Sequence, residues 1–204
     1  IETIAFSDGN NIALFGANVA NATSNLTITS GDGHNTLDAS NLGESVTISV
    51  GSGNDTILGG TGADSIDGGA GNDSITAGAG ADSIVGGAND DTIVLAGNLT
   101  VADTIAGGTG TDTLTFTDAG GAVNELDNVT AIETITLGDA ATAVTTVDAL
   151  VASGATLTVN AAGLTGSNTL TWTGTAENDG KFSITGGASN DTILGGTGAD
   201  SIDG

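Results

Sequence analysis

The sequence predicts an all-β chain that coils as a right-handed parallel β-roll and β-solenoid. The first observation behind this prediction is a nine-residue period in residues 51–94, where an aspartate recurs at every ninth place and an isoleucine follows two places later. The second is the alternation of apolar and hydroxyl residues in segments outside that array, such as residues 46–50. Nine residues are too few for a helix with its connection, but they suffice for a short strand and a tight turn.

Each nine-residue unit supplies its own strand, turn and core residue. The Thr-Ile and Ser-Ile pairs favour a strand, and the glycines before them allow backbone conformations with positive φ. The isoleucine must point inward, because no other side chain of the unit is large enough to make a core. If each unit turns the chain through half a circle, one coil takes eighteen residues and the aspartates stack along two edges. One edge carries Asp55, Asp73 and Asp91, and the other carries Asp64 and Asp82.

This stacking predicts a metal ion. Coils of a parallel stack lie about 4.8 Å apart, and two carboxylates at that distance repel by roughly 3–4 kcal/mol at an effective dielectric near 20. Residues 51–94 contain no lysine or arginine to compensate them. A hard divalent cation between coils would do so, and calcium accepts six to eight oxygens, backbone carbonyls included, whereas magnesium prefers a tight octahedron and keeps its waters.

The predicted ligands are the repeat carboxylates and the carbonyls two and four places before them, which an extended turn places on the carboxylate's side. The carboxylates are those of Asp55, Asp64, Asp73, Asp82, Asp91, Asp112, Asp191 and Asp200. The carbonyls are those of Gly51, Gly53, Gly60, Gly62, Gly69, Gly71, Gly78, Gly80, Gly87, Gly108, Gly110, Gly187, Gly196 and Gly198. Alternatively, each aspartate only caps its glycine turn as an Asx-turn residue. That alternative explains one aspartate at a time, but not why they stack without counter-charge.

The repeated pattern G-G-x-G-x-D-x-U-x resembles the RTX (repeats-in-toxin) family of calcium-binding nonapeptide repeats. The resemblance implies a β-roll with several calcium ions in its Gly-Asp turns. It also implies export of the unfolded chain through a type I secretion channel, with folding on external calcium. Within the family, wide Thr-rich coils with an Ile-Glu-Thr-Ile segment look most like those of bacterial surface-layer and giant adhesin-type proteins.

Four regions are predicted along the chain. Residues 1–50 form irregular β-coils leading into the roll, and residues 51–115 form the roll itself, with a looped-out turn at 96–100 where the rhythm slips. Residues 116–185 form wider Thr- and Ala-rich coils, with one short helix at 147–151, and residues 186–204 begin a second roll.

A longer period overlies these regions. Residues 1–4 return as residues 132–135, and residues 54–68 return letter for letter as residues 190–204. These offsets of about 131 and 136 residues indicate a segment of a longer tandem array.

Charge and composition narrow the function. The chain has 25 acidic residues and one basic residue, and this strong negative charge argues against nucleic acid or an anionic membrane as partner. The absence of cysteine excludes a disulfide framework, and no apolar run is long enough to span a bilayer. Extracellular calcium modules typically bind calcium with a Kd of about 10⁻⁴–10⁻³ M. Such sites would stay empty at cytosolic calcium concentrations, so the chain is expected outside the cell. Without metal we expect it to be disordered.

Other conspicuous residues have plainer interpretations. His34 lies in a glycine-rich turn without a nucleophile elbow, so a surface position is favoured over a catalytic base and no enzyme is predicted. Lys181 is expected in solvent and Trp172 in the core of a wide coil. Glu177 and Asp179 bracket an acidic turn that is either solvated or holds one further cation.

Three functions follow, in order of preference. The first is a calcium-stabilised structural module of a large secreted tandem-repeat protein, such as a surface layer, adhesin or extracellular filament. It would self-associate into a lattice or filament, or contact a cell-surface polysaccharide. The second is the non-catalytic RTX secretion or folding tail of a secreted hydrolase or epimerase, against which the long repeat argues. The third is an ice- or glycan-binding face made by the repeat hydroxyls, which alternate between two sides of the coil. The hydroxyl residues are Thr56, Ser65, Ser74, Ser83 and Thr92.

Overall fold

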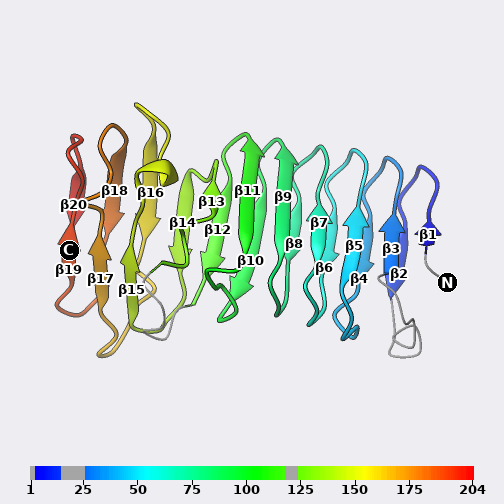
Figure 1. The fold of residues 1–204 in the computed structure, drawn as a ribbon, viewed down its shortest axis with the longest axis horizontal. Helices are drawn as coiled ribbons and strands as arrows, with labels where there is room; N and C mark the ends of the chain where they lie inside the picture. The colour runs from blue at the N-terminus through cyan, green and yellow to red at the C-terminus, as the bar shows by residue number, and fades with distance from the viewer. Residues whose placement is uncertain (1–2, 15–25, 118–123) are drawn as a thin grey trace. The chain divides into compact units, whose positions relative to one another are not determined.

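The computed structural model describes residues 3–14, 26–117 and 124–204, and these segments contain twenty β-strands, one short 3₁₀-helix and no α-helix. All strand pairs among the described residues are parallel, so the fold is the predicted all-β parallel β-solenoid (Figure 1). Its described residues divide into two compact units. No helix in these segments is long and apolar enough to cross a membrane. Ile1 and Glu2, part of the first Ile-Glu-Thr-Ile segment, lie outside the described residues.

The first unit comprises residues 1–94 and 103–112, and its chain alternates between two parallel sheets, strand by strand. One sheet contains β1 (Thr3–Ala5), β3 (Leu26–Thr29), β5 (Val46–Ser49), β7 (Ser65–Asp67), β9 (Ser83–Ala88) and β11 (Thr104–Thr109). The other contains β2 (Ile12–Leu14), β4 (Thr36–Asp38), β6 (Thr56–Leu58), β8 (Ser74–Thr76) and β10 (Thr92–Ala96).

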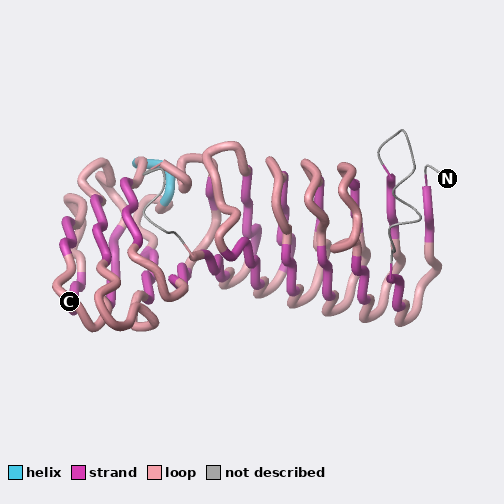
Figure 2. Tube along the Cα trace, turned by 90° about the horizontal axis from the view of Figure 1, so that it is seen from below, coloured by secondary structure: helices cyan, strands magenta, loops and turns pink. Residues whose placement is uncertain are grey.

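The register of the first unit confirms the predicted coil. Ile75 pairs with Ile57, eighteen residues earlier, and with Ile93, eighteen residues later. The same spacing joins Ile66 to Ile84 in the opposite sheet. All five isoleucines are at most 1% exposed, and each contributes roughly 1.5–3 kcal/mol through burial. The repeated coils are visible in the Cα trace (Figure 2).

The rhythm slips after β10, as predicted. The chain turns at Gly97 and Asn98, where the Asn98 N–H donates to the Leu95 carbonyl, before the next strand begins at Thr104. Ile105 therefore pairs with Ile84 across 21 residues instead of eighteen.

The second unit comprises residues 95–102 and 113–204 and has wider coils. One set of paired strands is β12 (Thr113–Phe116), β14 (Thr134–Leu137), β16 (Thr156–Asn160), β18 (Lys181–Thr185) and β20 (Ser201–Asp203). A second sheet contains β15 (Thr142–Thr145), β17 (Leu170–Thr173) and β19 (Thr192–Leu194). The short strand β13 (Val129–Thr130) lies between β12 and β14 along the chain. The predicted helix at 147–151 is shorter and tighter than expected, a 3₁₀-helix, η1 (Asp148–Leu150).

Larger side chains fill these wider coils. Ile135 pairs with Val159 across 24 residues, so each coil encloses more space than an eighteen-residue coil. Trp172 is fully buried and meets Phe182 edge to face, with ring centroids 5.6 Å apart. The prediction that Trp172 belongs to the core is therefore correct.

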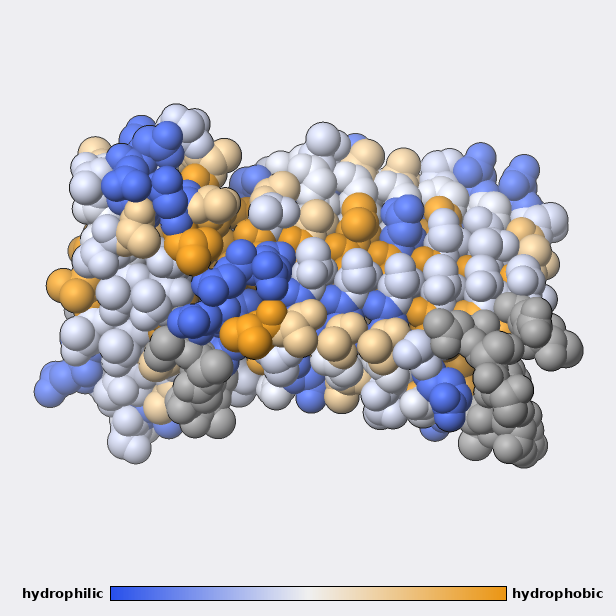
Figure 3. Space-filling view, viewed as in Figure 1, coloured by the Kyte–Doolittle hydropathy of each residue, from blue (hydrophilic) through white to orange (hydrophobic). Residues whose placement is uncertain are grey.

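Among the described residues, few large apolar side chains are exposed; they are Val85, Val101, Leu194 and Ile202. On the face shown in Figure 3, most residues are of intermediate hydropathy. The predicted separation of the repeat hydroxyls is confirmed, because Thr56, Ser74 and Thr92 align in one sheet whereas Ser65 and Ser83 align in the other. No single face of the described coils collects all five.

Candidate metal centre: two aspartate ladders

The repeat aspartates of the first unit form two buried ladders, one at the start of each sheet's strands. Ladder 1 consists of Asp55, Asp73, Asp91 and Asp112, and ladder 2 of Asp64, Asp82 and Asp103. Every member is at most 2% exposed. Parallel stacking produces this arrangement, because each aspartate directly precedes a strand that pairs in register with its counterpart one coil away.

A cross-coil hydrogen bond joins each aspartate of a ladder, which we call a rung, to the next. In ladder 1 the Asp55 N–H donates to Asp73 Oδ1 (2.7 Å), and the Asp73 N–H donates to Asp91 Oδ1 (2.8 Å). In ladder 2 the Asp64 N–H donates to Asp82 Oδ1 (2.9 Å). The side chains thus bridge between coils, which differs from the purely local Asx turn that the sequence left open.

Burial makes the ionised ladders costly. Desolvation, opposed by the amide hydrogen bond and reinforced by neighbouring carboxylates, raises the pKa of Asp73 to about 7. The same causes raise the pKa of Asp91 to about 6. Desolvation also raises the pKa values of Asp55, Asp64 and Asp82. A carboxylate is a calcium ligand only when deprotonated, so protons and cations compete for these groups.

The second carboxylate oxygen separates the turns into two kinds. In what we call open turns, Oδ2 is buried and receives no hydrogen bond from the described residues; Asp55, Asp73 and Asp91 are of this kind. In closed turns, the glycine N–H four places earlier donates to Oδ2. This bond joins Gly60 to Asp64 (2.8 Å) and Gly187 to Asp191 (2.7 Å). Open turns have an unsatisfied buried acceptor, and closed turns do not.

The coil beneath each turn accounts for this difference. Gly69 and Gly71 stack on Gly51 and Gly53, and a Cβ at either upper glycine would overlap the carbonyl oxygen of the glycine below. Both upper glycines have positive φ, +85° and +131°. Gly60, in contrast, lies over Leu42, which belongs to a turn without the Gly-x-Gly pattern.

The predicted carbonyl ligands are partly engaged in the stacking. The carbonyls of Gly51, Gly60 and Gly69 each accept one N–H from the next coil, from Ala70, Ala79 and Ala88 at 2.9–3.1 Å. A carbonyl oxygen has two lone pairs, so this bond leaves one for a further ligand.

Two asparagines continue ladder 1 toward the N-terminus, and sequence reasoning missed both. The Asn35 N–H donates to Asp55 Oδ1, and the Asn11 N–H donates to Asn35 Oδ1 (3.1 Å). The Asn35 side-chain amide donates to the carbonyls of Gly31 (3.1 Å) and Gly33 (2.8 Å), four and two places earlier. These are the positions that the sequence predicted as carbonyl ligands in the aspartate turns. The signal for Asn35 was the Asn-Thr-Leu segment at 35–37, which parallels Asp-Thr-Ile.

Asp103 is a further ladder member outside the predicted ligand set. It is fully buried, and the Asp82 N–H donates to its Oδ1 (2.7 Å). The sequence signal was Asp-Thr-Ile at 103–105, displaced by the slip in rhythm.

Asp191 and Asp200 lie in register with non-acidic residues of the preceding coils. Leu170 N–H donates to Asp191 Oδ1 and Phe182 N–H to Asp200 Oδ1, both at 2.8 Å. Both aspartates are half-buried, and in the described residues neither one is stacked on a second repeat aspartate. They repeat the cross-coil bond without forming a ladder.

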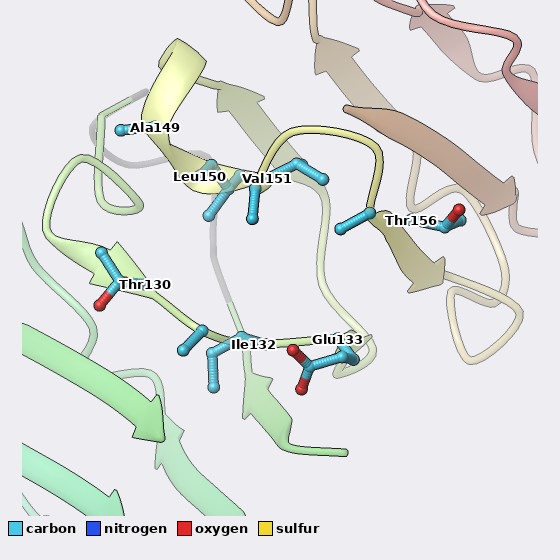
Figure 4. Close-up of a pocket in the computed structure, with 10 residues that line it drawn as sticks. Thr130, Ile132, Glu133, Ala149, Leu150, Val151 and Thr156 are labelled. Carbon is cyan, nitrogen blue, oxygen red and sulfur yellow. The ribbon is translucent and has the colours of Figure 1, made fainter. Parts of the chain in front are cut away.

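Outside the ladders, the described residues include the chain's single histidine and a cavity in the second unit. His34 is exposed, and its Nδ1 accepts the Asn54 N–H (2.8 Å) as part of an outer turn contact. A cavity of about 220 Å³ in the second unit is lined by segments 130–133, 149–152 and 155–156 (Figure 4). Glu133 is the one titratable side chain in that lining.

Comparison with known families identifies the repeats. The family model of the RTX calcium-binding nonapeptide repeat matches four times, over residues 47–75, 70–97, 102–115 and 183–204. These matches include every aspartate of both ladders, as well as Asp191 and Asp200. No curated protein and no solved structure matches the chain.

Proposed function

Because this chain carries RTX nonapeptide repeats, which bind calcium ions, we propose that it is a calcium-stabilised structural module of a large secreted tandem-repeat protein. Such a protein would form a surface layer, an adhesin or an extracellular filament. The repeat roll is a structural calcium-binding element and is not catalytic by itself. Self-association with further copies, or contact with a cell-surface polysaccharide, belongs to the same proposal.

The observation that carries the proposal is the set of buried Oδ2 atoms of Asp55, Asp73 and Asp91 that lack a donor. The comparison with Asn35 indicates what is required there. The turns at 31–35 and 51–55 share the Gly-x-Gly pattern and a positive φ at its second glycine, Gly33 (+114°) and Gly53 (+132°). In the first, the Asn35 amide donates to two carbonyls; in the second, a carboxylate oxygen replaces that donor.

An acceptor in the place of a donor turns the second site into a convergence of oxygens. Carboxylate and carbonyl oxygens are the ligands that calcium prefers, and calcium tolerates irregular geometry. We therefore assign the ladder carboxylates, with the glycine carbonyls of the turns, as the calcium ligands. Calcium supplies the positive charge between coils, and the chain supplies the fixed oxygens.

Calcium-dependent folding explains how such a chain could be exported and then become ordered. Ligands that repel one another in the empty state oppose folding, and the binding energy of the ion becomes folding energy. With affinities near 10⁻⁴–10⁻³ M, typical of extracellular modules, the chain would stay loose inside a cell and fold outside it.

Circular dichroism of the 204-residue chain during a calcium titration tests the proposal. We expect a coil-to-β transition in the millimolar range that a chelator reverses, with magnesium at equal concentration as the matched control. A β-spectrum indifferent to calcium and chelator would refute the metal-ladder assignment. Electron microscopy of the calcium-loaded chain addresses assembly: ordered arrays or filaments support a lattice-forming module, and dispersed monomers at high concentration contradict it.

A further inference from the structure

A second acidic cluster lies outside the nonapeptide repeats, within the second unit. Asp148 is the first residue of η1, the helix coloured cyan in Figure 2, and Glu177 and Asp179 lie in the turn between β17 and β18. One carboxylate oxygen from each of the three residues lies within 4.8 Å of the others. None of the three falls within a segment matched by the repeat model.

Glu177 distinguishes this cluster from an ordinary acidic turn. Its side chain is fully buried, and Oε1 accepts the N–H groups of Gly180 (2.7 Å) and Asp179 (3.2 Å). Oε2 is also buried but receives no hydrogen bond from any described residue. Burying a carboxylate oxygen without a hydrogen-bond or cation partner is energetically unfavourable. A bound cation removes this cost, and two exposed carboxylates beside it strengthen the attraction.

Backbone contacts hold the three carboxylates in place. The Asn178 N–H donates to Asp148 Oδ1 (2.9 Å), which joins η1 to the turn. The Gly154 N–H donates to the Asp179 carbonyl (2.9 Å), and the Thr197 N–H donates to the Glu177 carbonyl (3.1 Å). The turn is therefore tied to three other segments of its own unit, and the oxygens converge without help from an ion.

We propose that Asp148, Glu177 and Asp179 form a calcium site that is separate from the repeat ladders. Calcium–oxygen distances are about 2.3–2.6 Å, so two oxygens bound to one ion lie at most about 4.6–5.2 Å apart. Three oxygens within 4.8 Å of one another can therefore share one calcium ion. Three carboxylates exceed the one or two through which magnesium is usually bound, and calcium can complete a flexible shell of six to eight oxygens with water or carbonyl groups. The all-oxygen donor set disfavours zinc, which favours sulfur and nitrogen ligands.

Such an ion would join Asp148 to Glu177, which lie 29 residues apart in the chain. The coil between Asp148 and Glu177 contains β16 and β17 and has no stacked repeat aspartates. The site would therefore stabilise a wide coil in which the ladder mechanism is absent, and both mechanisms would respond to the same external calcium.

Native mass spectrometry of the full chain in calcium tests the site by counting bound ions. Asp179→Asn is the principal variant, because the exposed Asp179 side chain makes no described hydrogen bond and its loss should not impair folding. Asp148→Asn and Glu177→Gln accompany it, and Asp127→Asn, an exposed position of the same unit, is the matched control. We expect each of the three variants to bind one calcium fewer than wild type, and the control to bind the same number.

Two results separate this site from the ladders. Trp172, the chain's only tryptophan, lies in β17 next to the turn, so its emission should respond to calcium less in Asp179→Asn than in Asp127→Asn. Unchanged ion counts in both Asp179→Asn and Asp148→Asn would overturn the site while leaving the ladders intact. An Asp73→Asn variant that loses calcium while Asp179→Asn loses none would overturn it as well.

Discussion

The substitution Asp73→Asn should stabilise the chain in the absence of calcium and reduce the stability that calcium adds. Asparagine keeps an oxygen that can accept the Asp55 N–H, so the cross-coil bond of 2.7 Å is retained. It replaces Oδ2, which has no donor, with an NH₂ group like the one that Asn35 uses toward Gly31 and Gly33. Only the charge and one cation ligand are lost.

The two expected magnitudes are similar in size. Without calcium, a carboxylate one coil away, about 4.8 Å distant, repels Asp73 by up to roughly 3.5 kcal/mol at an effective dielectric near 20. Partial protonation lowers this repulsion, because burial raises the pKa of Asp73 to about 7, so a gain of about 1–3 kcal/mol is expected at pH 8. With about 10 mM calcium and a Kd of about 10⁻⁴–10⁻³ M, losing one site costs about 1.4–2.7 kcal/mol.

Urea unfolding followed by circular dichroism measures both effects. It is run in calcium and in chelator, with an excluded osmolyte in the chelator series so that the folded state is populated. Glu44→Gln is the matched control, since Glu44 is exposed in the same unit and loses the same charge. We expect Asp73→Asn to raise the urea midpoint in chelator. In calcium the lost site offsets this gain, so the rise in midpoint on adding calcium should be smaller for Asp73→Asn than for wild type. An equal loss in both solutions would mean that the carboxylate serves only as a hydrogen-bond acceptor.

Two further predictions concern the glycines and the protonation of the ladders. Gly69→Ala should destabilise the calcium-loaded chain by more than Gly154→Ala, although both positions have positive φ. A Cβ at Gly69 would overlap the Gly51 carbonyl, whereas nothing lies within 4 Å of a Cβ at Gly154. Backbone strain alone costs about 1–3 kcal/mol at either position, and equal shifts in melting temperature would contradict the stacking argument. In chelator, the folded-state pKa values of Asp73 and Asp91 are raised to about 7 and about 6, so the protonated fold is favoured and stability should fall as pH rises from about 4 through 7. Calcium affinity should rise over the same interval, and urea midpoints at pH 5 and pH 8 that show no fall would disprove the linkage.

The nine-residue period made much of the first unit predictable. A strict period fixes the register between coils, and the register fixes which residues stack, so Ile57 over Ile75 and Asp55 over Asp73 follow from counting. The repulsion between stacked carboxylates follows as well, because residues 51–94 contain no lysine or arginine.

The conformation of each turn was not predictable from its own nine residues. The Gly60 and Gly69 turns share the pattern Gly-x-Gly-x-Asp, yet one is closed and the other open. The difference depends on the coil below, which offers Leu42 to one and Gly51 to the other. Comparing each turn with the residues eighteen places earlier would have revealed it.

The cluster of Asp148 with Glu177 could not be placed for a different reason. The coils of the second unit have no constant length, so no spacing rule brings positions 148 and 177 together. Their proximity depends on η1 and on the width of one irregular coil.

The asparagine rungs show that the cross-coil bond does not need a charge. Asn35 Oδ1 accepts the Asn11 N–H in the same way that Asp73 Oδ1 accepts the Asp55 N–H. An amide also satisfies the neighbouring carbonyls, which a carboxylate cannot do. If the rungs served only to join coils, asparagine would be the better residue at every position, because it avoids burying charge. Aspartate at the successive rungs from Asp55 onward is therefore costly in the empty fold, and it becomes favourable only where a cation joins the carboxylate and the carbonyls.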